Sequence, residues 1–233
     1  MQSFSLESCL PITLACVVVS FLVCGIPFGL IIGKLSGNGD IRNAGSGNIG
    51  TTNALRVAGP KVAAATLLFD VLKGVLGVCI SRVVIANMAF EGNLAMLAPG
   101  APADWVLALI ALTCLCGHVF SPYLHFHGGK GIAVGVGVLF GWYWPLALIH
   151  LGIFIVFVAI TKYVSVGSMV TAAFVPVTVS IAFPYSSIPC KLLMAVMGVI
   201  VVWAHRSNIK KLLAGKESKL SFTKRVSKMD DAS

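Results

Sequence analysis

One polar segment gathers small residues, hydroxyl groups, amides and an arginine within a short stretch of chain. Residues 45–56 read Gly-Ser-Gly-Asn-x-Gly-x-Thr-Asn-x-x-Arg, which places Ser46, Asn48, Thr52 and Arg56 close together. Glycines turn backbone N–H groups toward a ligand, and hydroxyls and a guanidinium fork suit phosphate oxygens. An ordinary capped turn at a helix start is the simpler interpretation. The density of polar groups favours an anion-binding loop, with a helix starting near residue 51 or 52.

A second polar segment ends in Gly-Gly-Lys-Gly at residues 128–131, directly before an apolar run. This order predicts a phosphate cradle at a helix start with one cation, Lys130, inside it. No GxxxxGK[ST] spacing can be built around Lys130, so ATP hydrolysis is not supported. His125 and His127 lack the cysteine or carboxylate cluster that would complete a zinc site. We therefore expect neither a metal ion nor a cofactor.

A third polar segment, starting at His205, follows the last apolar run. If that helix continues, His205 and Asn208 share one face at i, i+3. An imidazole titrates near neutrality, so His205 is a candidate general base. Snorkelling basic residues at a helix end are the simpler interpretation, and we apply it to Lys211 and Lys216.

Two ionisable residues, Asp70 and Lys73, lie inside an apolar run. Charges at that depth are unfavourable unless they are paired or functional. Their i, i+3 spacing lets them pair on one helix face. We interpret them as an ion pair that supports the site.

The composition identifies the medium that surrounds these segments. The chain has 233 residues, of which 58% are hydrophobic and 11% charged, and its mean hydropathy is +0.95. A soluble domain carries about a quarter charged residues, so most of this surface must face lipid. The net charge of +9 comes largely from one loop and the C-terminal tail. That distribution indicates a positive-inside bias and not a nucleic-acid-binding face.

The fold predicted from these features is an all-α polytopic membrane protein. Apolar runs occupy residues 10–32, 62–85, 105–120, 131–161, 166–183 and 188–204. The run 131–161 is too long for one crossing and short for two, and Pro145 is the expected break. This gives about seven transmembrane helices, or five or six if the middle run is re-entrant. We expect one membrane domain over residues 1–220 and a short disordered cytoplasmic tail over 221–233.

With these motifs in view, the chain resembles the bacterial acyl-phosphate:glycerol-3-phosphate acyltransferases, the PlsY family. The resemblance covers residues 25–219 and rests on the 45–56 pattern, on Gly-His-x-Phe at 117–120 with Gly-Gly-Lys-Gly-Ile-Ala at 128–133, and on His-Arg-x-Asn-Ile at 205–209 with Gly-x-Glu at 215–217. The Asp-x-x-Lys-Gly element at 70–74 also fits. His125 and His127 depart from the lysines usual in the family, which bears on substrate affinity and not on reaction type.

The resemblance implies an inner-membrane enzyme of bacteria that moves an acyl group from acyl phosphate to sn-glycerol-3-phosphate, and a functional link to an enzyme that makes acyl phosphate. The expected residues for glycerol-3-phosphate are Ser46, Asn48, Thr52 and Arg56, and those for acyl phosphate are Gly128, Gly129, Lys130 and Gly131. The expected catalytic residues are Lys130, His205 and Asn208, with a substrate phosphate as the alternative base. The expected supporting residues are Asn53, Asp70, Lys73, His118, Arg206 and Glu217.

Two further features bear on these expectations. CoA-dependent glycerol-phosphate acyltransferases resemble one another in a His-x-x-x-x-Asp pair. Here the residues five positions after the histidines are Tyr123, Lys130, Ile132, Ile155 and Lys210, so no such pair exists. This favours acyl phosphate over acyl-CoA as the donor.

A membrane carrier for an organic phosphate is the alternative function, but the polar groups gather on one side instead of at the midplane where transporters bind.

The Lys and Arg asymmetry predicts an N-terminus outside and a C-terminus inside the cytoplasm. Alkaline phosphatase, which is active only outside, should therefore be inactive when fused after Lys219 and active when inserted within residues 91–101. The enzyme activity of cells carrying each fusion is the measurement. An active tail fusion together with an inactive loop fusion would contradict the orientation.

Overall fold

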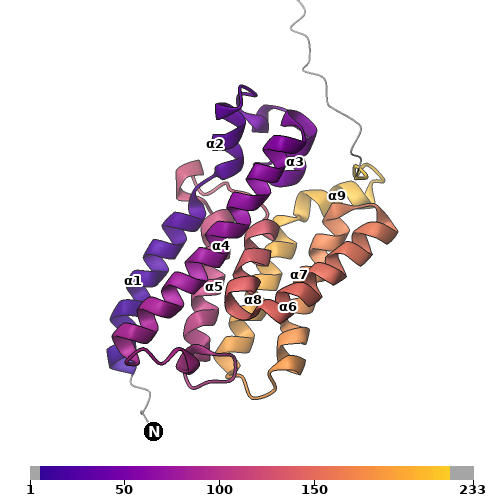
Figure 1. Cartoon of the computed structure of the whole chain (residues 1–233). Coiled ribbons are helices and arrows are strands. Elements are labelled where there is room, and N and C mark those ends of the chain that lie inside the picture. Colours follow the sequence, from indigo (N-terminus) through magenta and orange to yellow (C-terminus); the bar gives the residue numbers. More distant parts are fainter. Residues whose placement is uncertain (1–5, 221–233) are drawn as a thin grey trace, which may run out of the picture.

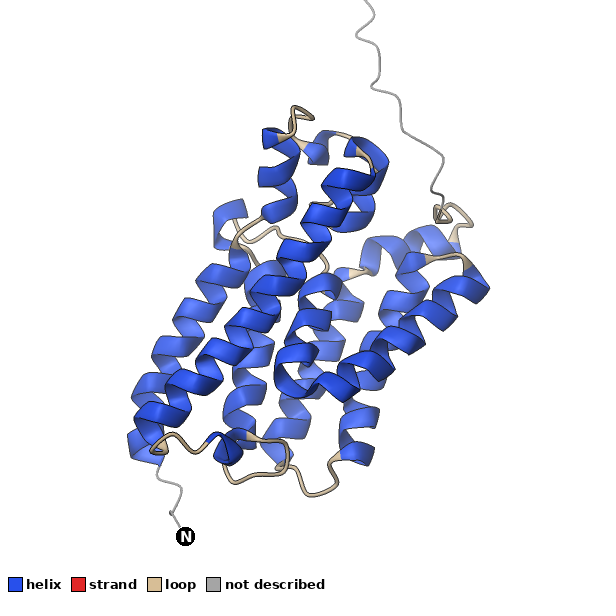
Figure 2. Ribbon diagram, viewed as in Figure 1, coloured by secondary structure: helices blue, strands red, loops and turns tan. Residues whose placement is uncertain are grey.

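The computed structural model describes residues 6–220, which form a bundle of helices with no strand in that range (Figures 1 and 2). The all-α prediction is thus confirmed, whereas the predicted tail 221–233 lies outside the described residues. The helices are α1 (Leu6–Gly25), α2 (Phe28–Leu35), α3 (Thr51–Ala58), α4 (Pro60–Ala89), α5 (Asp104–Val119), α6 (Ile132–Thr161), α7 (Val164–Ala182), α8 (Ile188–Ala204) and α9 (Arg206–Leu213). Three short 3₁₀ turns join them: η1 (Ile41–Asn43), η2 (Leu94–Leu97) and η3 (Pro122–Leu124).

The number of membrane-spanning helices is lower than the predicted seven. Five segments of the described chain are long and apolar enough to cross a bilayer, or six if α8 and α9, which are bent by 53°, form one span. The difference arises in the run 131–161, whose two helical arms, kinked at Tyr143, count as one span. By length and composition, the smaller count of five or six crossings holds.

Helix α6 follows a hairpin path, because two helical arms meet at a kink. It begins beside Lys130, and the residue that follows it, Lys162, accepts a bond from Leu220 N at 2.8 Å, so both ends lie at one end of the bundle. The break is at Tyr143, whose φ of −158° and ψ of 98° are not helical. Pro145 has no N–H and its ring clashes with the preceding turn, which explains a break two residues earlier. The predicted break at Pro145 is confirmed.

The two arms of α6 differ in length. The first, residues 132–142, holds eleven residues and is about 17 Å long, roughly half of a hydrocarbon core. It runs alongside α4 in the same direction, while the second arm runs antiparallel to α7 (Figure 1). With both arms counted, seven helical segments of the described chain run along the bundle, namely α1, α4, α5, the two arms of α6, α7 and α8. The first arm of α6 is too short to cross a bilayer, so these segments are not seven full crossings.

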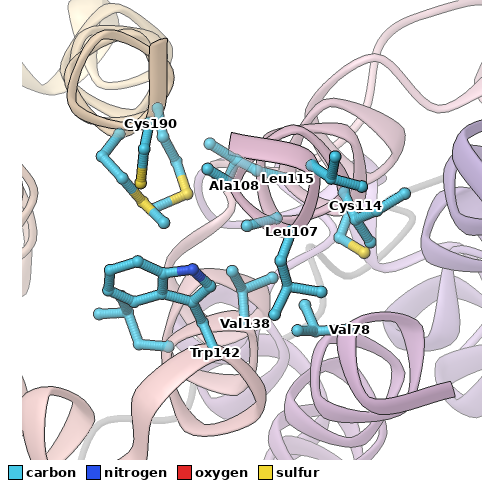
Figure 3. Close-up of a cluster of buried hydrophobic side chains, with 14 of the residues drawn as sticks. Val78, Leu107, Ala108, Cys114, Leu115, Val138, Trp142 and Cys190 are labelled. Carbon is cyan, nitrogen blue, oxygen red and sulfur yellow. The ribbon is translucent and has the colours of Figure 1, made fainter. Parts of the chain in front are cut away.

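Small residues allow the short arm to pack closely on α4. A Cβ on Gly137 would collide with the carbonyl of Val71, and one on Gly74 would lie 2.5 Å from the carbonyl of Val134. Such contacts hold helices together in lipid, where no hydrophobic force favours one helix over a lipid tail. Figure 3 shows the interior beside this seam, where Trp142 and Val138 face residues of α5 and α8. The outer surface is apolar, as at Ile181, which is 76% exposed.

One charged side chain caps the end of the short first arm of α6. Arg82 of α4 donates from a guanidinium nitrogen to the carbonyl of Trp142 at 2.5 Å. This carbonyl sits at the end of the first arm, where a helix carries excess negative partial charge and lacks N–H partners. Arg82 therefore supplies a hydrogen-bond donor to the carbonyl of Trp142, which the break near Pro145 leaves without a helical N–H partner.

Replacing Arg82 by methionine should lower the free energy of unfolding by about 1.5–3 kcal/mol, because a hydrogen bond to a charged group is lost and a carbonyl is left unpaired. Thermal or denaturant unfolding of the purified protein in detergent measures the change. Lys191→Met is the matched control, since Lys191 also donates to a backbone carbonyl, that of Pro184, but from an exposed position. Equal losses in the two variants would mean that Arg82 does not cap the arm.

Candidate functional site

Asn53 organises the first predicted loop. Its side chain is 1% exposed and lies on α3, where Oδ1 accepts from Ser46 N at 2.7 Å. Its Nδ2 donates to the carbonyls of Ile41 and Asn48, both at 2.8 Å. A Cβ on Gly45 would collide with this amide, so the turn needs a glycine there. Asn53 thus holds the loop closed and leaves the Ser46 and Asn48 side chains half-buried at its edge.

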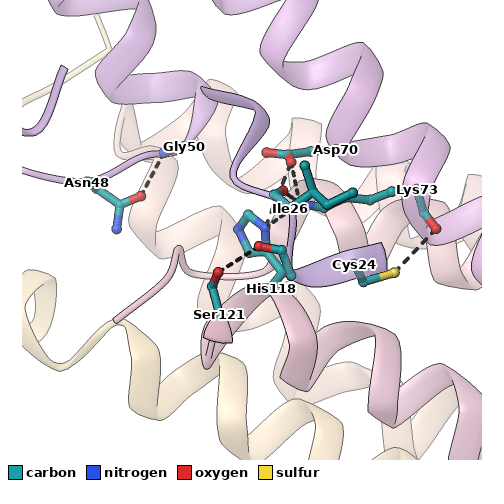
Figure 4. A network of polar contacts seen from close by, with 9 residues as sticks. Cys24, Ile26, Asn48, Gly50, Asp70, Lys73, His118 and Ser121 are labelled. Atoms are coloured by element: carbon teal, nitrogen blue, oxygen red, sulfur yellow. Dashed lines mark hydrogen bonds and ion pairs between the residues drawn. The ribbon is translucent and has the colours of Figure 1, made fainter. Parts of the chain in front are cut away.

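The helix expected after this loop is confirmed, since α3 begins at Thr51 with Gly50 as its N-cap. Asn48 Oδ1 accepts from Gly50 N at 2.9 Å and fixes the turn (Figure 4). Thr52 and Arg56 are four residues apart on α3 and so lie on one face. Thr51 Oγ1 is buried without a hydrogen-bond partner among the described residues. The first loop therefore ends in a short helix that carries a hydroxyl and a guanidinium side by side.

The second predicted loop differs from the expected phosphate cradle in how its amides are used. Gly128 N donates to Val119 O at 3.0 Å and Gly129 N donates to His118 O at 3.1 Å. These two N–H groups pin the loop to the end of α5, so they are not open to an anion. Gly131, with a φ of +81°, then turns the chain into α6. The first-turn N–H groups of α6 lack helical acceptors, as at the start of any helix.

Lys130 is the cation of this loop. Its pKa is lowered to about 8, chiefly by burial, with Glu217 opposing the shift and the cations Lys211 and Arg56 adding to it. The charges that act on this ammonium group thus come from all three predicted segments. They include Lys211, for which the sequence predicts snorkelling.

The third segment does not continue the preceding helix but bends at His205. His205 ends α8 and precedes α9, and the two helices meet at 53°. Its side chain is 2% exposed, and Nδ1 donates to Val201 O at 2.8 Å. In the neutral imidazole the other nitrogen, Nε2, is therefore the one with a free lone pair. Asn208 N donates to His205 O at 2.8 Å, so the pair stays together across the bend.

Glu217 returns from beyond α9 to orient this segment. Its Oε1 accepts from Asn208 Nδ2 at 2.7 Å and from Ser165 Oγ at 2.9 Å. The other amide atom, Asn208 Oδ1, is buried and has no hydrogen-bond partner among the described residues. Asn208 thus presents a fixed acceptor near His205. Ser165 was not singled out from the sequence, since a serine at a helix start carries no distinctive signal.

The predicted ion pair is confirmed, and it belongs to a larger group. Lys73 Nζ lies 2.8 Å from Asp70 Oδ1, with both side chains almost fully buried. The same ammonium bonds the carbonyl of Ile26 at 2.8 Å and His118 Nδ1 at 3.0 Å (Figure 4). No local pattern in the sequence connects His118 with this pair, because Lys73 and His118 are 45 residues apart.

Arg206 does not join the cluster. Its guanidinium lies over the ring of Trp203 at 4.1 Å, and both side chains are exposed. This is a snorkelling arrangement at the edge of the bundle. Among the described residues, no group of three or more His, Cys, Asp or Glu side chains is placed to hold a metal ion. What converges is a set of cations, hydroxyls, an amide and an imidazole, which suits phosphorylated ligands.

Comparison with known proteins gives the same family in three ways. A family model described as glycerol-3-phosphate acyltransferase matches residues 14–215. Curated relatives named glycerol-3-phosphate acyltransferase include one from Rhizobium meliloti, 40% identical over 222 residues with 94% of this chain and 98% of the relative covered. Another, from Bartonella henselae, is 38% identical over 203 residues, with 87% and 89% covered.

Two solved structures are also similar. Both are crystal structures of PlsY, an integral membrane glycerol 3-phosphate acyltransferase. The glycerol 3-phosphate form has a TM-score of 0.76 and 30% identity, and the lysophosphatidic acid form has a TM-score of 0.73 and 28% identity. Each match covers 90% of this chain and 96% of the other.

Proposed function

Because the chain belongs to the glycerol-3-phosphate acyltransferase family, we propose that it transfers an acyl group from acyl phosphate to sn-glycerol-3-phosphate in a bacterial cytoplasmic membrane. The products are lysophosphatidate and phosphate. The observation that carries this proposal is the convergence of Arg56, Lys130 and Lys211 beside His205 and Glu217 at one end of a lipid-facing bundle. Both substrates bring a phosphate to such a place, and the acyl chain needs the apolar surroundings.

Glycerol-3-phosphate binds at the first loop in this proposal. Arg56 forks onto its phosphate, and Thr52 donates from the same face of α3. Ser46 and Asn48 complete the site from the edge of the loop that Asn53 holds closed. Thr51 Oγ1, buried without a partner in the described chain, is a further hydroxyl at this point.

Acyl phosphate binds at the second loop. Its phosphate meets Lys130 and the first-turn N–H groups of α6, while its chain extends into the bilayer. Gly128, Gly129 and Gly131 act by shape, since their backbone approaches His118, Val119 and Leu115 more closely than a Cβ would allow. Their role is thus to bring Lys130 into place.

The reaction needs orientation and charge neutralisation more than a strong nucleophile, because the mixed anhydride is already activated. The attacking hydroxyl of glycerol-3-phosphate forms a bond to the acyl carbon, and the acyl–phosphate C–O bond breaks with its electron pair leaving on phosphate. Lys130 stabilises that charge. Asn208 Oδ1 accepts a hydrogen bond from the attacking hydroxyl. As that hydroxyl attacks, its proton passes to His205 Nε2 or to a substrate phosphate.

The remaining parts of the proposal concern the cellular setting. The protein is a multi-pass membrane protein, and we propose that its site lies on the cytoplasmic side, with a functional link to an enzyme that forms acyl phosphate. Residues 6–220 form one acyltransferase domain in this proposal. Asp70, Lys73 and His118 support the second loop, Glu217 supports Asn208, and Arg206 anchors α9 at the lipid edge.

The test of the function is a donor comparison with purified protein. With glycerol-3-phosphate present, palmitoyl phosphate should yield lysophosphatidate and palmitoyl-CoA should not, since the chain has no His-x-x-x-x-Asp pair. Comparable rates with palmitoyl-CoA would contradict the assigned donor. Uptake of labelled glycerol-3-phosphate into liposomes without a lipid-soluble product would instead favour a carrier.

Lys130→Ala should lower kcat about 10²–10³-fold, since removing one preorganised charge-stabilising donor costs about 2.7–4 kcal/mol in the transition state. Lys130→Arg should restore little, because a planar fork is not a compact ammonium. The control is Lys34→Ala, an exposed cation of the same end of the bundle, whose rate should stay near that of the wild type. Near-normal turnover in Lys130→Ala would remove this residue from the catalytic group.

The lowered pKa of Lys130 adds a pH dependence to this prediction. The ammonium form predominates below its pKa of about 8, so kcat/KM should fall as the pH rises through that value. A bound anion favours the charged amine, which should move the corresponding limb of kcat to higher pH. Lys130→Arg should lack this limb, because a guanidinium stays charged throughout.

A further inference from the structure

Lys73 has three close polar partners. Its Nζ forms hydrogen bonds with the carbonyl of Ile26 at 2.8 Å and with His118 Nδ1 at 3.0 Å, and an ion pair with Asp70 Oδ1 at 2.8 Å. Asp70, 2% exposed, balances the charge where water is excluded. Breaking one such contact would leave a buried charge partly unpaired, so the three partners are held at fixed distances.

The lysine also sets the protonation of His118. Since Lys73 donates to Nδ1, that nitrogen is unprotonated, and a proton there would face a cation. The proton of the neutral ring is therefore on Nε2. This nitrogen lies against Gly129, where a Cβ would collide with it. One branch from Lys73 thus ends directly beneath the loop that carries Lys130.

The other branch leads to the first loop. Lys73 holds the carbonyl of Ile26, which lies in the break between α1 and α2 (Figure 4). From that break α2 rises and packs against the first loop, where a Cβ on Gly29 would collide with the carbonyl of Ile49. The two loops proposed to hold the two substrates are therefore both connected to the Lys73 ammonium group, one through Ile26 and the other through His118.

We propose that Lys73, acting through His118 and Ile26, is a positioning residue that fixes the distance between the glycerol-3-phosphate loop and the acyl-phosphate loop. This inference rests on the proposed function. Each loop keeps its own phosphate-binding groups when the link is broken. The attacking hydroxyl and the acyl carbon, however, lose their alignment, and a misplacement of about 1 Å can lower a rate on the order of 10²-fold. The expected signature is a loss of kcat with little change in either KM.

The decisive variant is His118→Asn. The shorter amide reaches the place of Nδ1, so Lys73 keeps an acceptor, but nothing replaces Nε2 beneath Gly129. We expect kcat to fall about tenfold or more, while the KM values for glycerol-3-phosphate and palmitoyl phosphate each change less than about threefold. Lys73→Met, which releases both branches, should lower kcat further.

His150→Asn is the matched control. His150 is another fully buried histidine with one side-chain partner, Thr178 at 2.7 Å, and it lies on the second arm of α6. Its kcat should stay within about twofold of the wild type. A His118→Asn variant that equals His150→Asn, or that changes KM and not kcat, would overturn the positioning role.

Hydrogen exchange gives a readout that does not depend on activity. The amides of Gly128 and Gly129, bonded to Val119 and His118 carbonyls, should exchange at least about tenfold faster in His118→Asn and at the wild-type rate in His150→Asn. Unchanged protection in His118→Asn would contradict the link even if the protein proves to lack acyltransferase activity. A wild-type protein that makes no lysophosphatidate, with the exchange result as expected, would overturn the proposed function alone.

Discussion

The ammonium of Lys73 holds two hydrogen-bond acceptors and one ion-pair partner, inside a bundle whose surroundings are lipid. In that medium an unpaired charge or carbonyl cannot form hydrogen bonds with water, so losing a protein partner costs free energy. The partners of such a group are therefore held in place. The partners belong to α4, to the break between α1 and α2, and to α5. The loops that project from these elements carry the polar residues of the site. One buried cation therefore defines the frame in which the loops are arranged.

The same constraint explains the path of α6. Pro145 removes one N–H and ends the first arm about halfway through the bundle, which exposes a carbonyl at Trp142. Arg82 satisfies that carbonyl, and glycines let the arm lie against α4 without a gap. The hairpin brings the start of α6, with its free N–H groups, and the end of its second arm to one end of the bundle. Glu217 lies near enough to Lys130 there for its charge to raise the pKa of that lysine.

The site is prepared for ligands by groups that lack partners within the described chain. Asn208 Oδ1 and Thr51 Oγ1 are buried without hydrogen bonds, although most buried polar atoms in proteins are paired. Glu217 and Asn53 fix the elements around them, so these atoms keep their direction. The amides of the glycine loop, in contrast, are already used. The structure thus separates residues that position the site from residues left open to bind.

The sequence by itself determined the features that depend on neighbouring residues. Apolar runs identified the helices, the i, i+3 spacing identified the pair Asp70 and Lys73, and Pro145 identified the break in α6. Tertiary structure decided what depends on distant residues. Nothing local shows that His118 bonds Lys73 across 45 positions or that Glu217 returns to Asn208 and Ser165. Nor does a run of glycines show whether its N–H groups face a ligand or a neighbouring carbonyl, because that depends on which helix end packs beneath the loop.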